Sequence, residues 1–222
     1  MAQRVVQPRM AWLREARAAP EFAGFMATVA PLLARSPRGD GHRVLVLPGF
    51  RASDTSTRPI RWFLDRLGYR THGWGLGTNG GPTSHATDGM RQLVDRLIET
   101  DQAPISLVGW SLGGVYAHGI AERVPDHIRQ VITLGSPLNY APLLPVKVPA
   151  TSIYSKSDTV VPHRASMLGS GPLRENIEVR GSHIGLGHNP PVLVVVADRL
   201  AQPADDWQPY RVPRWARAWL PS

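Results

Sequence analysis

The sequence predicts an α/β fold with a single, mostly parallel sheet and helices on both of its faces. Short apolar runs rich in β-branched residues alternate along the chain with segments whose apolar residues recur at helical spacing. Alternation of this kind is typical of a parallel sheet, because two parallel strands need a long crossover, usually a helix. The chain has 222 residues, 42% of them hydrophobic, which is enough to fill the core of one such domain.

The first strand is expected in "HRVLVLPGF", residues 42–50, where an apolar run stops at Pro48 and Gly49. A helix should begin at Pro59, because proline fits the first turn of a helix, and it should end at Gly68. Its apolar stripe consists of Ile60, Phe63, Leu64 and Leu67. This strand and this helix form the first unit of the expected sheet.

The same unit repeats along the rest of the chain. Further strands are expected at residues 69–76, 105–111, 128–136, 151–155 and 176–179. Further helices are expected over the stripe Met90, Leu93, Val94, Leu97 and Ile98, over Leu112–Arg123, and over Pro190–Leu200 with Asn189 as its cap. Sheets of this kind bind ligands in the loops beyond the carboxyl ends of their strands, so we expect a functional site there.

The string "GWSLGG", residues 109–114, places Ser111 where an apolar strand passes directly into a helix. A turn this tight strains the serine backbone, and Gly109 and Gly113 remove side chains that would collide with neighbouring elements. The hydroxyl then lies at a helix N-terminus, where backbone N–H groups favour a developing negative charge. The context predicts that Ser111 is a nucleophile, with a small residue at a crowded turn as the alternative.

A serine nucleophile needs a histidine base and an acid that orients it. Asp158 follows the expected strand at 151–155, and His183 follows the one at 176–179. Asp158 as an ordinary turn residue is the alternative for the acid. His188 competes with His183 as the base, but it directly precedes the closing helix, and we therefore favour His183.

The chain resembles the α/β-hydrolases in the strings that carry these residues and in "LGTNGGP", "VITLGSP" and "GSHIGLG". Within that family it resembles the small bacterial lipases and esterases that lack a lid. The resemblance runs from residue 44 to about residue 200. It implies that Ser111 is the nucleophile, Asp158 the acid and His183 the base. It also implies an oxyanion hole formed by the backbone N–H groups of Phe50 and Leu112.

The resemblance further implies hydrolysis of carboxylic esters, as in an esterase or lipase, through an acyl-enzyme intermediate. The same triad would also suit hydrolysis of a thioester or an amide, or transfer of the acyl group to an acceptor. Many relatives carry His-Gly where this chain has Pro48-Gly49. This departure keeps open a non-catalytic, hydrolase-like binding protein.

No cap domain is expected, because only 14 residues, "PLNYAPLLPVKVPA", separate two of the expected strands. The absence of a cap predicts an open site. Apolar side chains beside the expected site could contact the substrate or pack in the core: Trp110, Tyr140, Leu143, Leu144 and Val146. His118, in the helix after Ser111, is expected to be a surface or hydrogen-bonded histidine.

The formal charge of +8 comes almost wholly from scattered arginines, and no nucleic-acid-binding motif accompanies them. We therefore expect a small-molecule or lipid ester as partner rather than a nucleic acid. The chain has no cysteine, and its His, Asp and Glu residues show no metal-ligand spacing, so we expect no metal and no other cofactor.

The two ends of the chain are expected to be additions to this domain. Residues 1–41 should form a helical extension, with residues 22–34 as a docked helix rather than a signal-peptide core. Residues 203–222 interleave tryptophan with arginine; we favour docking on the domain, with contact to an anionic membrane surface as the alternative. No apolar run is long enough to span a membrane, and we assign the cytoplasm by default. The sequence leaves the oligomeric state open.

Overall fold

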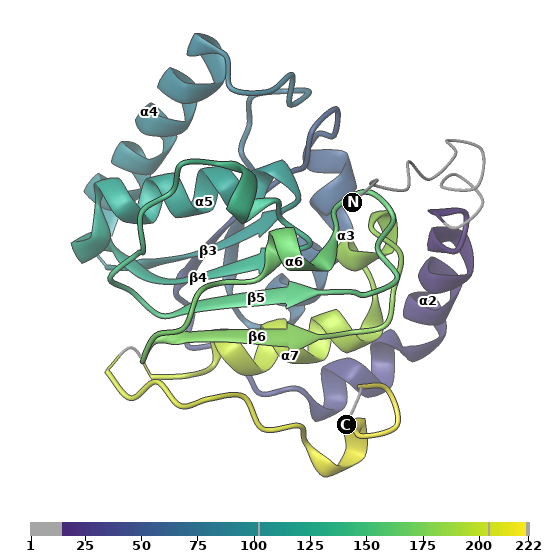
Figure 1. Ribbon diagram of the computed structural model, residues 1–222. Coiled ribbons are helices and arrows are strands. Elements are labelled where there is room, and N and C mark those ends of the chain that lie inside the picture. Colours follow the sequence, from purple (N-terminus) through teal and green to yellow (C-terminus); the bar gives the residue numbers. More distant parts are fainter. Residues whose placement is uncertain (1–14, 102, 204, 221–222) are drawn as a thin grey trace.

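One six-stranded parallel sheet lies at the centre of the computed structural model, which describes residues 15–101, 103–203 and 205–220 (Figure 1). The strands are β1 (Arg43–Leu47), β2 (Arg70–His72), β3 (Ile105–Trp110), β4 (Ile128–Leu134), β5 (Ala150–Tyr154) and β6 (Arg174–Glu178). Their order is β2-β1-β3-β4-β5-β6, and every neighbouring pair is parallel. The predicted fold class, one sheet flanked by helices, is confirmed.

Helices connect these strands. The α-helices are α2 (Ala18–Arg35), α3 (Asp54–Leu67), α4 (Ser84–Asp101), α5 (Leu112–Arg123), α6 (His163–Ser166) and α7 (Pro190–Leu200). Short 3-10 helices are η1 (Pro125–His127), η2 (Leu138–Tyr140), η3 (Ile184–Gly187) and η4 (Arg214–Ala216). Between β4 and β5 there is η2 and otherwise extended chain, so no cap domain interrupts the described part of the fold there.

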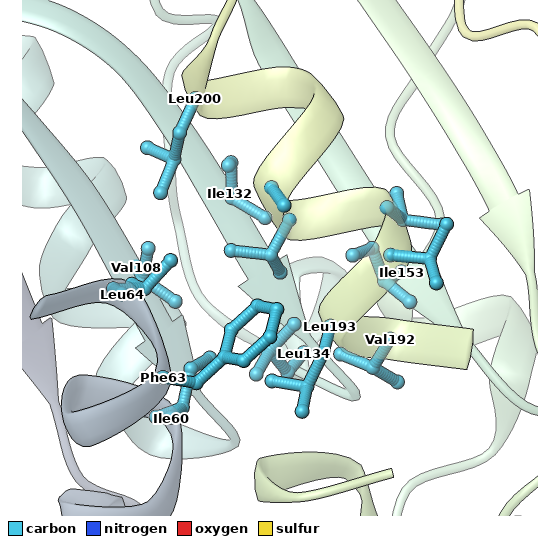
Figure 2. Packing of buried hydrophobic residues seen from close by; sticks show 14 of the residues in the cluster. Ile60, Phe63, Leu64, Val108, Ile132, Leu134, Ile153, Val192, Leu193 and Leu200 are labelled. Atoms are coloured by element: carbon cyan, nitrogen blue, oxygen red, sulfur yellow. The ribbon is translucent and has the colours of Figure 1, made fainter. Parts of the chain in front are cut away.

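The helices form two layers because successive strand residues point to opposite faces of the sheet. In β1, Val44 and Val46 pack with α2, α3 and α7, whereas Leu45 and Leu47 pack with α4 and α5. Figure 2 shows the first of these cores, in which Phe63 of α3 lies among side chains of the sheet and α7. Each fully buried aliphatic or aromatic side chain there contributes about 1.5–3 kcal/mol through removal from water.

Helix α3 begins at Asp54, earlier than the expected start at Pro59, so the proline lies inside it. The helix tolerates this proline because it lies in the second turn, where its missing N–H deprives only the carbonyl of Thr55 of a partner. The expected end is confirmed: Gly68 has a left-handed backbone with φ of 101°.

The second strand is shorter than the expected residues 69–76. The chain turns away from the sheet after His72, and the carboxylate of Asp54 accepts the N–H groups of Trp74 and Gly75, both at 2.9 Å. These N–H groups therefore cannot pair with a neighbouring strand. The side chain of the first residue of α3 thus marks the end of β2.

The C-terminal segment lies beside the edge strand β6 and beside α2 (Figure 1). Its partly buried Trp215 and Trp219 pack against the core that α7 covers, and Leu220 is 7% exposed. None of the helices in the described ranges combines the length and apolarity that crossing a bilayer requires.

Candidate functional site

Ser111 occupies the turn between β3 and α5 with a strained backbone, φ 53° and ψ −122°. A Cβ at Gly109 would collide with the backbone of Gly113, and one at Gly113 would collide with the carbonyl oxygen of Leu47. Both glycines of the motif are therefore required for the turn to pack against its neighbours. The N–H of Ser111 donates to the carbonyl of Leu134 at 2.8 Å, which fixes the turn to the end of β4.

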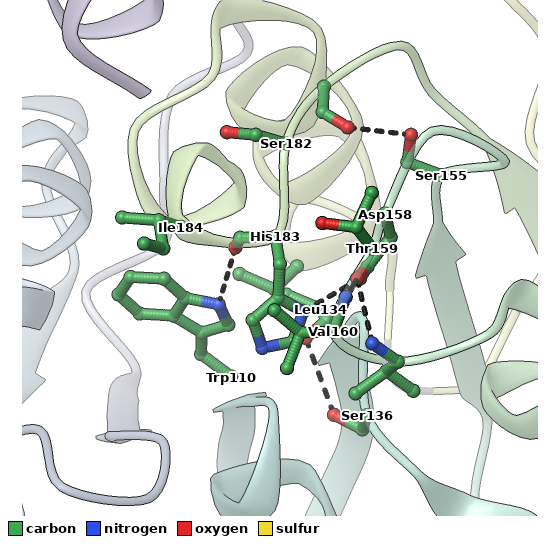
Figure 3. Close-up of polar contacts among 12 residues, drawn as sticks. Trp110, Leu134, Ser136, Ser155, Asp158, Thr159, Val160, Ser182, His183 and Ile184 are labelled. Carbon is green, nitrogen blue, oxygen red and sulfur yellow. Dashed lines mark hydrogen bonds and ion pairs between the residues drawn. The ribbon is translucent and has the colours of Figure 1, made fainter. Parts of the chain in front are cut away.

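Asp158 and His183 form a hydrogen-bonded pair beyond the ends of β5 and β6 (Figure 3). The Nδ1–H of His183 donates to Oδ2 of Asp158 at 2.7 Å, and both side chains are more than 90% buried. The other carboxylate oxygen, Oδ1, accepts the N–H groups of Val160 and Val161, both at 2.8 Å. One carboxylate oxygen is held by backbone N–H groups and the other accepts the hydrogen bond from Nδ1. The carboxylate therefore fixes the orientation of the imidazole ring and leaves Nε2 available to accept a proton.

The end of β4 links this pair to the serine turn. Gly135 has φ 53°, and a Cβ there would lie 3.0 Å from Oδ2 of Asp158 and 3.3 Å from Nδ1 of His183. Trp110, the residue before Ser111, donates from Nε1 to the carbonyl of His183 at 3.1 Å. The structure thus brings the three predicted residues to one edge of the sheet. Within the described residues Ser111 Oγ forms no hydrogen bond with His183; hydrogen bonds between a nucleophile and its base are often long without substrate and tighten only around it.

The loop of Phe50, one expected oxyanion donor, passes directly beside the serine. A Cβ at Gly49 would lie 3.0 Å from the Cβ of Ser111 and 3.7 Å from its Oγ. Leu112, the other expected donor, is the first residue of α5, and its N–H is among those that have no partner within the helix. Gly49, the residue before Phe50, therefore lies beside Ser111 in space, and Leu112 follows Ser111 in the chain.

Asn79 fixes the shape of that loop, a role that sequence reasoning missed. This fully buried residue donates from Nδ2 to the carbonyl of Pro48 at 2.9 Å. Its backbone carbonyl accepts the N–H of Arg51 at 2.7 Å. Its position between glycines in "LGTNGGP" is a signal for a tight loop, but nothing in the sequence pairs it with Pro48.

A second group of hydrogen-bonded Ser, His and Asp residues lies near the amino ends of β1 and β3. His42 bonds through Nδ1 to Asp40 and through Nε2 to Ser106 Oγ, the latter at 2.9 Å. Ser106 is 0% exposed in the body of β3, so no substrate carbonyl can reach it. Ser111 is partly exposed at a strand's carboxyl end. Accessibility, rather than hydrogen bonding alone, therefore favours Ser111 as the nucleophile.

The two other histidines considered from the sequence lie apart from Asp158. His188 bonds through Nε2 to the carbonyl of Ala18 at 3.1 Å and contacts the ring of Phe22 edge-on. The expectation for His118 was wrong: it is 4% exposed, and its Nε2 has no partner among the described residues. Asn189 caps α7 by position, but its side chain donates to the carbonyl of Arg180 instead of the helix.

The candidate substrate contacts differ in how exposed their side chains are. Trp110 packs its ring against Gly187 and donates to the carbonyl of His183, so it joins the serine turn to the His183 loop. Tyr140 and Leu144 are 71% and 64% exposed. Leu143 and Leu144 line a cavity of 170 Å³, while Val146 is buried in the core on the α5 side.

No cluster of His, Asp and Glu within the described ranges could hold a metal ion.

A family model described as alpha/beta hydrolase fold matches residues 20–180. A pimeloyl-(acyl-carrier protein) methyl ester esterase from Shewanella sp. (strain MR-7) is 34% identical over 106 residues, which are 48% of this chain and 39% of that protein. The chain therefore spans about two fifths of the length of this curated relative.

Solved structures also resemble the chain. One reported for LipS and LipT, two metagenome-derived lipolytic enzymes, has a TM-score of 0.58 at 19% identity and covers 74% of this chain and 93% of that chain. The pyrethroid hydrolase PytH has a TM-score of 0.60 at 15% identity, covering 74% and 99%. Alpha/beta hydrolase domain-containing protein 10 from mouse has a TM-score of 0.56 at 15% identity, covering 75% and 92%. At identities this low the likeness concerns the fold alone.

Proposed function

Because the chain belongs to the α/β-hydrolase fold family, we propose that it is a serine hydrolase that cleaves carboxylic esters. Ser111 is the nucleophile, His183 the base and Asp158 the acid that orients the base. The observation that carries the proposal is the 2.7 Å hydrogen bond between His183 and Asp158, beside a strained serine at a strand-to-helix turn. The relative named as a methyl ester esterase supports an ester as the substrate.

The reaction proceeds in two steps. Oγ of Ser111 attacks the ester carbonyl carbon while Nε2 of His183 takes its proton, and the N–H groups of Phe50 and Leu112 donate to the oxyanion. The protonated His183 then gives this proton to the leaving alkoxide as the C–O bond breaks. His183 then takes a proton from water as the water attacks the acyl carbon, the bond from that carbon to Oγ breaks, and His183 returns the proton to Oγ, which releases the acid and restores Ser111. Asp158 stabilises the imidazolium in both steps.

The acyl group would lie on an apolar rim formed by the exposed Tyr140 and Leu144 and the partly exposed Leu143. The short connection between β4 and β5 leaves this rim without a covering segment in the described part of the chain. An open rim suits acyl chains of different lengths, because no described segment covers it. The length preference separates an esterase from a lipase.

The test compares hydrolysis of p-nitrophenyl esters, from acetate to palmitate, by wild-type protein, Ser111→Ala and Ser106→Ala. We expect Ser111→Ala to lose roughly 10³-fold or more in kcat, because it removes the nucleophile. Ser106→Ala is the matched control: it should keep the activity but lose about 1–3 kcal/mol of stability, because buried His42 loses a partner.

Further substrates distinguish ester hydrolysis from the reactions that the same triad could perform instead. Thioester and amide panels, and a second alcohol as acceptor, would reveal a thioesterase, an amidase or an acyltransferase. A folded wild-type protein that hydrolyses none of these substrates, and that a serine-directed fluorophosphonate does not label, would overturn the proposal and favour a non-catalytic binding protein.

A further inference from the structure

Two glutamates from the N-terminal part of the chain contact the loops that carry Asp158 and His183. Figure 1 shows α2 beyond the carboxyl ends of β5 and β6, and the Asp158 and His183 loops occupy this side of the sheet. Glu15 lies just before α2 and is 5% exposed, and Glu21 lies in the first turn of this helix. Neither residue belongs to the triad, and both are separated from these loops by more than 140 residues of sequence.

Glu15 bridges the two loops with its two carboxylate oxygens. Oε1 accepts the hydroxyl of Thr159 at 2.7 Å and the Thr159 N–H at 3.4 Å. Oε2 accepts the N–H of Ile184 at 2.9 Å. One side chain therefore ties the residue after Asp158 to the residue after His183, and the separation of these two neighbours sets how far apart the acid and the base lie.

Glu21 holds the other side of His183. Its Oε1 accepts the N–H of Ser182 at 2.8 Å, and its Oε2 accepts the Ser182 hydroxyl at 2.7 Å. The hydroxyl oxygen of Ser182 in turn accepts the N–H of Gly185 at 3.0 Å, and a Cβ at Gly185 would collide with the Glu21 carboxylate. The backbone on both sides of His183 is thus held by carboxylates.

These contacts require carboxylates rather than amides. The hydrogen bonds that the two carboxylates accept from Thr159, Ser182 and Ile184 all come from N–H or O–H donors, so the NH2 of a glutamine would face another donor. Burial acts to raise the pKa of Glu15, but the hydrogen bonds from Ile184, Thr159 and the backbone of His183 outweigh it and hold this pKa below its usual value. Ionised acceptors form hydrogen bonds roughly twice as strong as neutral ones.

We propose that Glu15 and Glu21 are positioning residues that hold Asp158 and His183 at hydrogen-bonding distance. The proposal rests on the proposed function for the catalytic meaning of that pair, but the geometry it concerns is measurable without any substrate. A displacement of about 1 Å at a reacting group can cost on the order of 10²-fold in rate. The part of the chain from Glu15 to Glu21 is therefore part of the site.

The test uses the full chain with Glu15→Gln, Glu21→Gln and, as matched control, Glu122→Gln, an exposed glutamate on α5. The first readout is the low-field proton NMR signal of the His183 Nδ1–H, assigned by its loss in His183→Gln. The second is the separation of kcat from KM with p-nitrophenyl esters. Both are measured well below the melting temperature of each variant.

We expect the low-field signal to shift or broaden in both variants and kcat to fall 10- to 100-fold with little change in KM, because substrate binding does not need the pair. The control should match the wild type. If a glutamine variant does not fold, Thr159→Val removes one hydroxyl donor and should give the same changes on a smaller scale.

A wild-type signal and wild-type kcat in the folded variants would overturn the proposal and leave the two glutamates a purely structural role. The NMR readout keeps the two proposals distinct. A protein without esterase activity whose low-field signal still depends on Glu15 and Glu21 would contradict the proposed function while supporting the positioning role.

Discussion

Gly135 adopts a backbone conformation with φ 53° directly against the Asp158 and His183 pair. Its place in the string "VITLGSP" marks a strand end, but the closeness of the pair follows from the packing of β4 against β5. The absence of a side chain at this position therefore serves the geometry of the site, since any Cβ would press on the carboxylate of Asp158.

Gly135→Ala should reduce kcat at least tenfold, because the new methyl group would clash with Leu186 and press on the Asp158 carboxylate and the His183 ring. The left-handed backbone adds a stability cost of about 1–2 kcal/mol. Gly68→Ala is the matched control: its φ is 101°, but the nearest atom to its Cβ is the Gly39 carbonyl oxygen at 3.6 Å. Kinetics and thermal melts of both variants check this, and a control that loses activity as strongly as Gly135→Ala would contradict it.

At this scale, the sequence supports hypotheses that depend on local context. Ser111, Asp158 and His183 could be singled out because each follows an apolar strand, and their roles stay predictions until the variants are assayed. Asn79, Glu15 and Glu21 could not be singled out. Their partners are remote in the sequence, and an isolated asparagine or glutamate gives no signal of what it will contact in the folded chain.

Among the elements, the central strands and the helices α5 and α7 lie close to where apolar periodicity predicts them. The departures occur where a side chain overrides periodicity. Asp54 ends β2 by accepting two N–H groups, and the four-residue α6 has no apolar repeat from which it could have been predicted. Strand and helix ends depend on such single contacts, and these are absent from the pattern of apolar residues.

The C-terminal segment is anchored by Arg199 of α7, which is 1% exposed. Its guanidinium donates to Glu175 at 2.9 Å and to the carbonyl of Gln208 at 2.7 Å, and it lies 5.3 Å from the ring centre of Tyr210. Glu175 also accepts the N–H of Tyr210 at 2.8 Å. The segment therefore completes the hydrogen bonding of a buried charge, in addition to covering the core with tryptophans.

Removal of the residues after Gln202 should lower the melting temperature by roughly 10 °C. Arg199 keeps Glu175 but loses the Gln208 carbonyl, which costs about 1–3 kcal/mol, and the core loses the cover of Trp215, Trp219 and Leu220. Each kcal/mol shifts Tm by about 2–4 °C at this size. The triple variant Arg211→Gln, Arg214→Gln and Arg217→Gln is the control, since it removes exposed charge from the segment and keeps its packing. An unchanged melting temperature on truncation, with weaker liposome binding in both variants, would favour contact with a membrane surface.

The stability of the whole molecule should depend on pH, because burial lowers the pKa of His42, His118 and His188. The effect is largest for His118, where burial and then the charge of Arg174 lower the pKa from 6.5 to about 4. Between these two values the unfolded chain binds a proton on His118 that the folded protein does not bind. Stability is therefore lost as the pH falls through this window, by roughly 3 kcal/mol in total.

The measurement is the melting temperature at pH 7.5 and pH 4.5 for wild-type protein, His118→Leu and the control His85→Leu, whose side chain is exposed. Wild type and control should lose stability together on acidification, while His118→Leu should lose roughly 2–3 kcal/mol less. The buried carboxylates, including Glu15, destabilise the fold further at low pH, but all three proteins share them, so the difference isolates His118. Equal losses in all three proteins would show that His118 accepts a proton in the folded state as readily as in the unfolded chain.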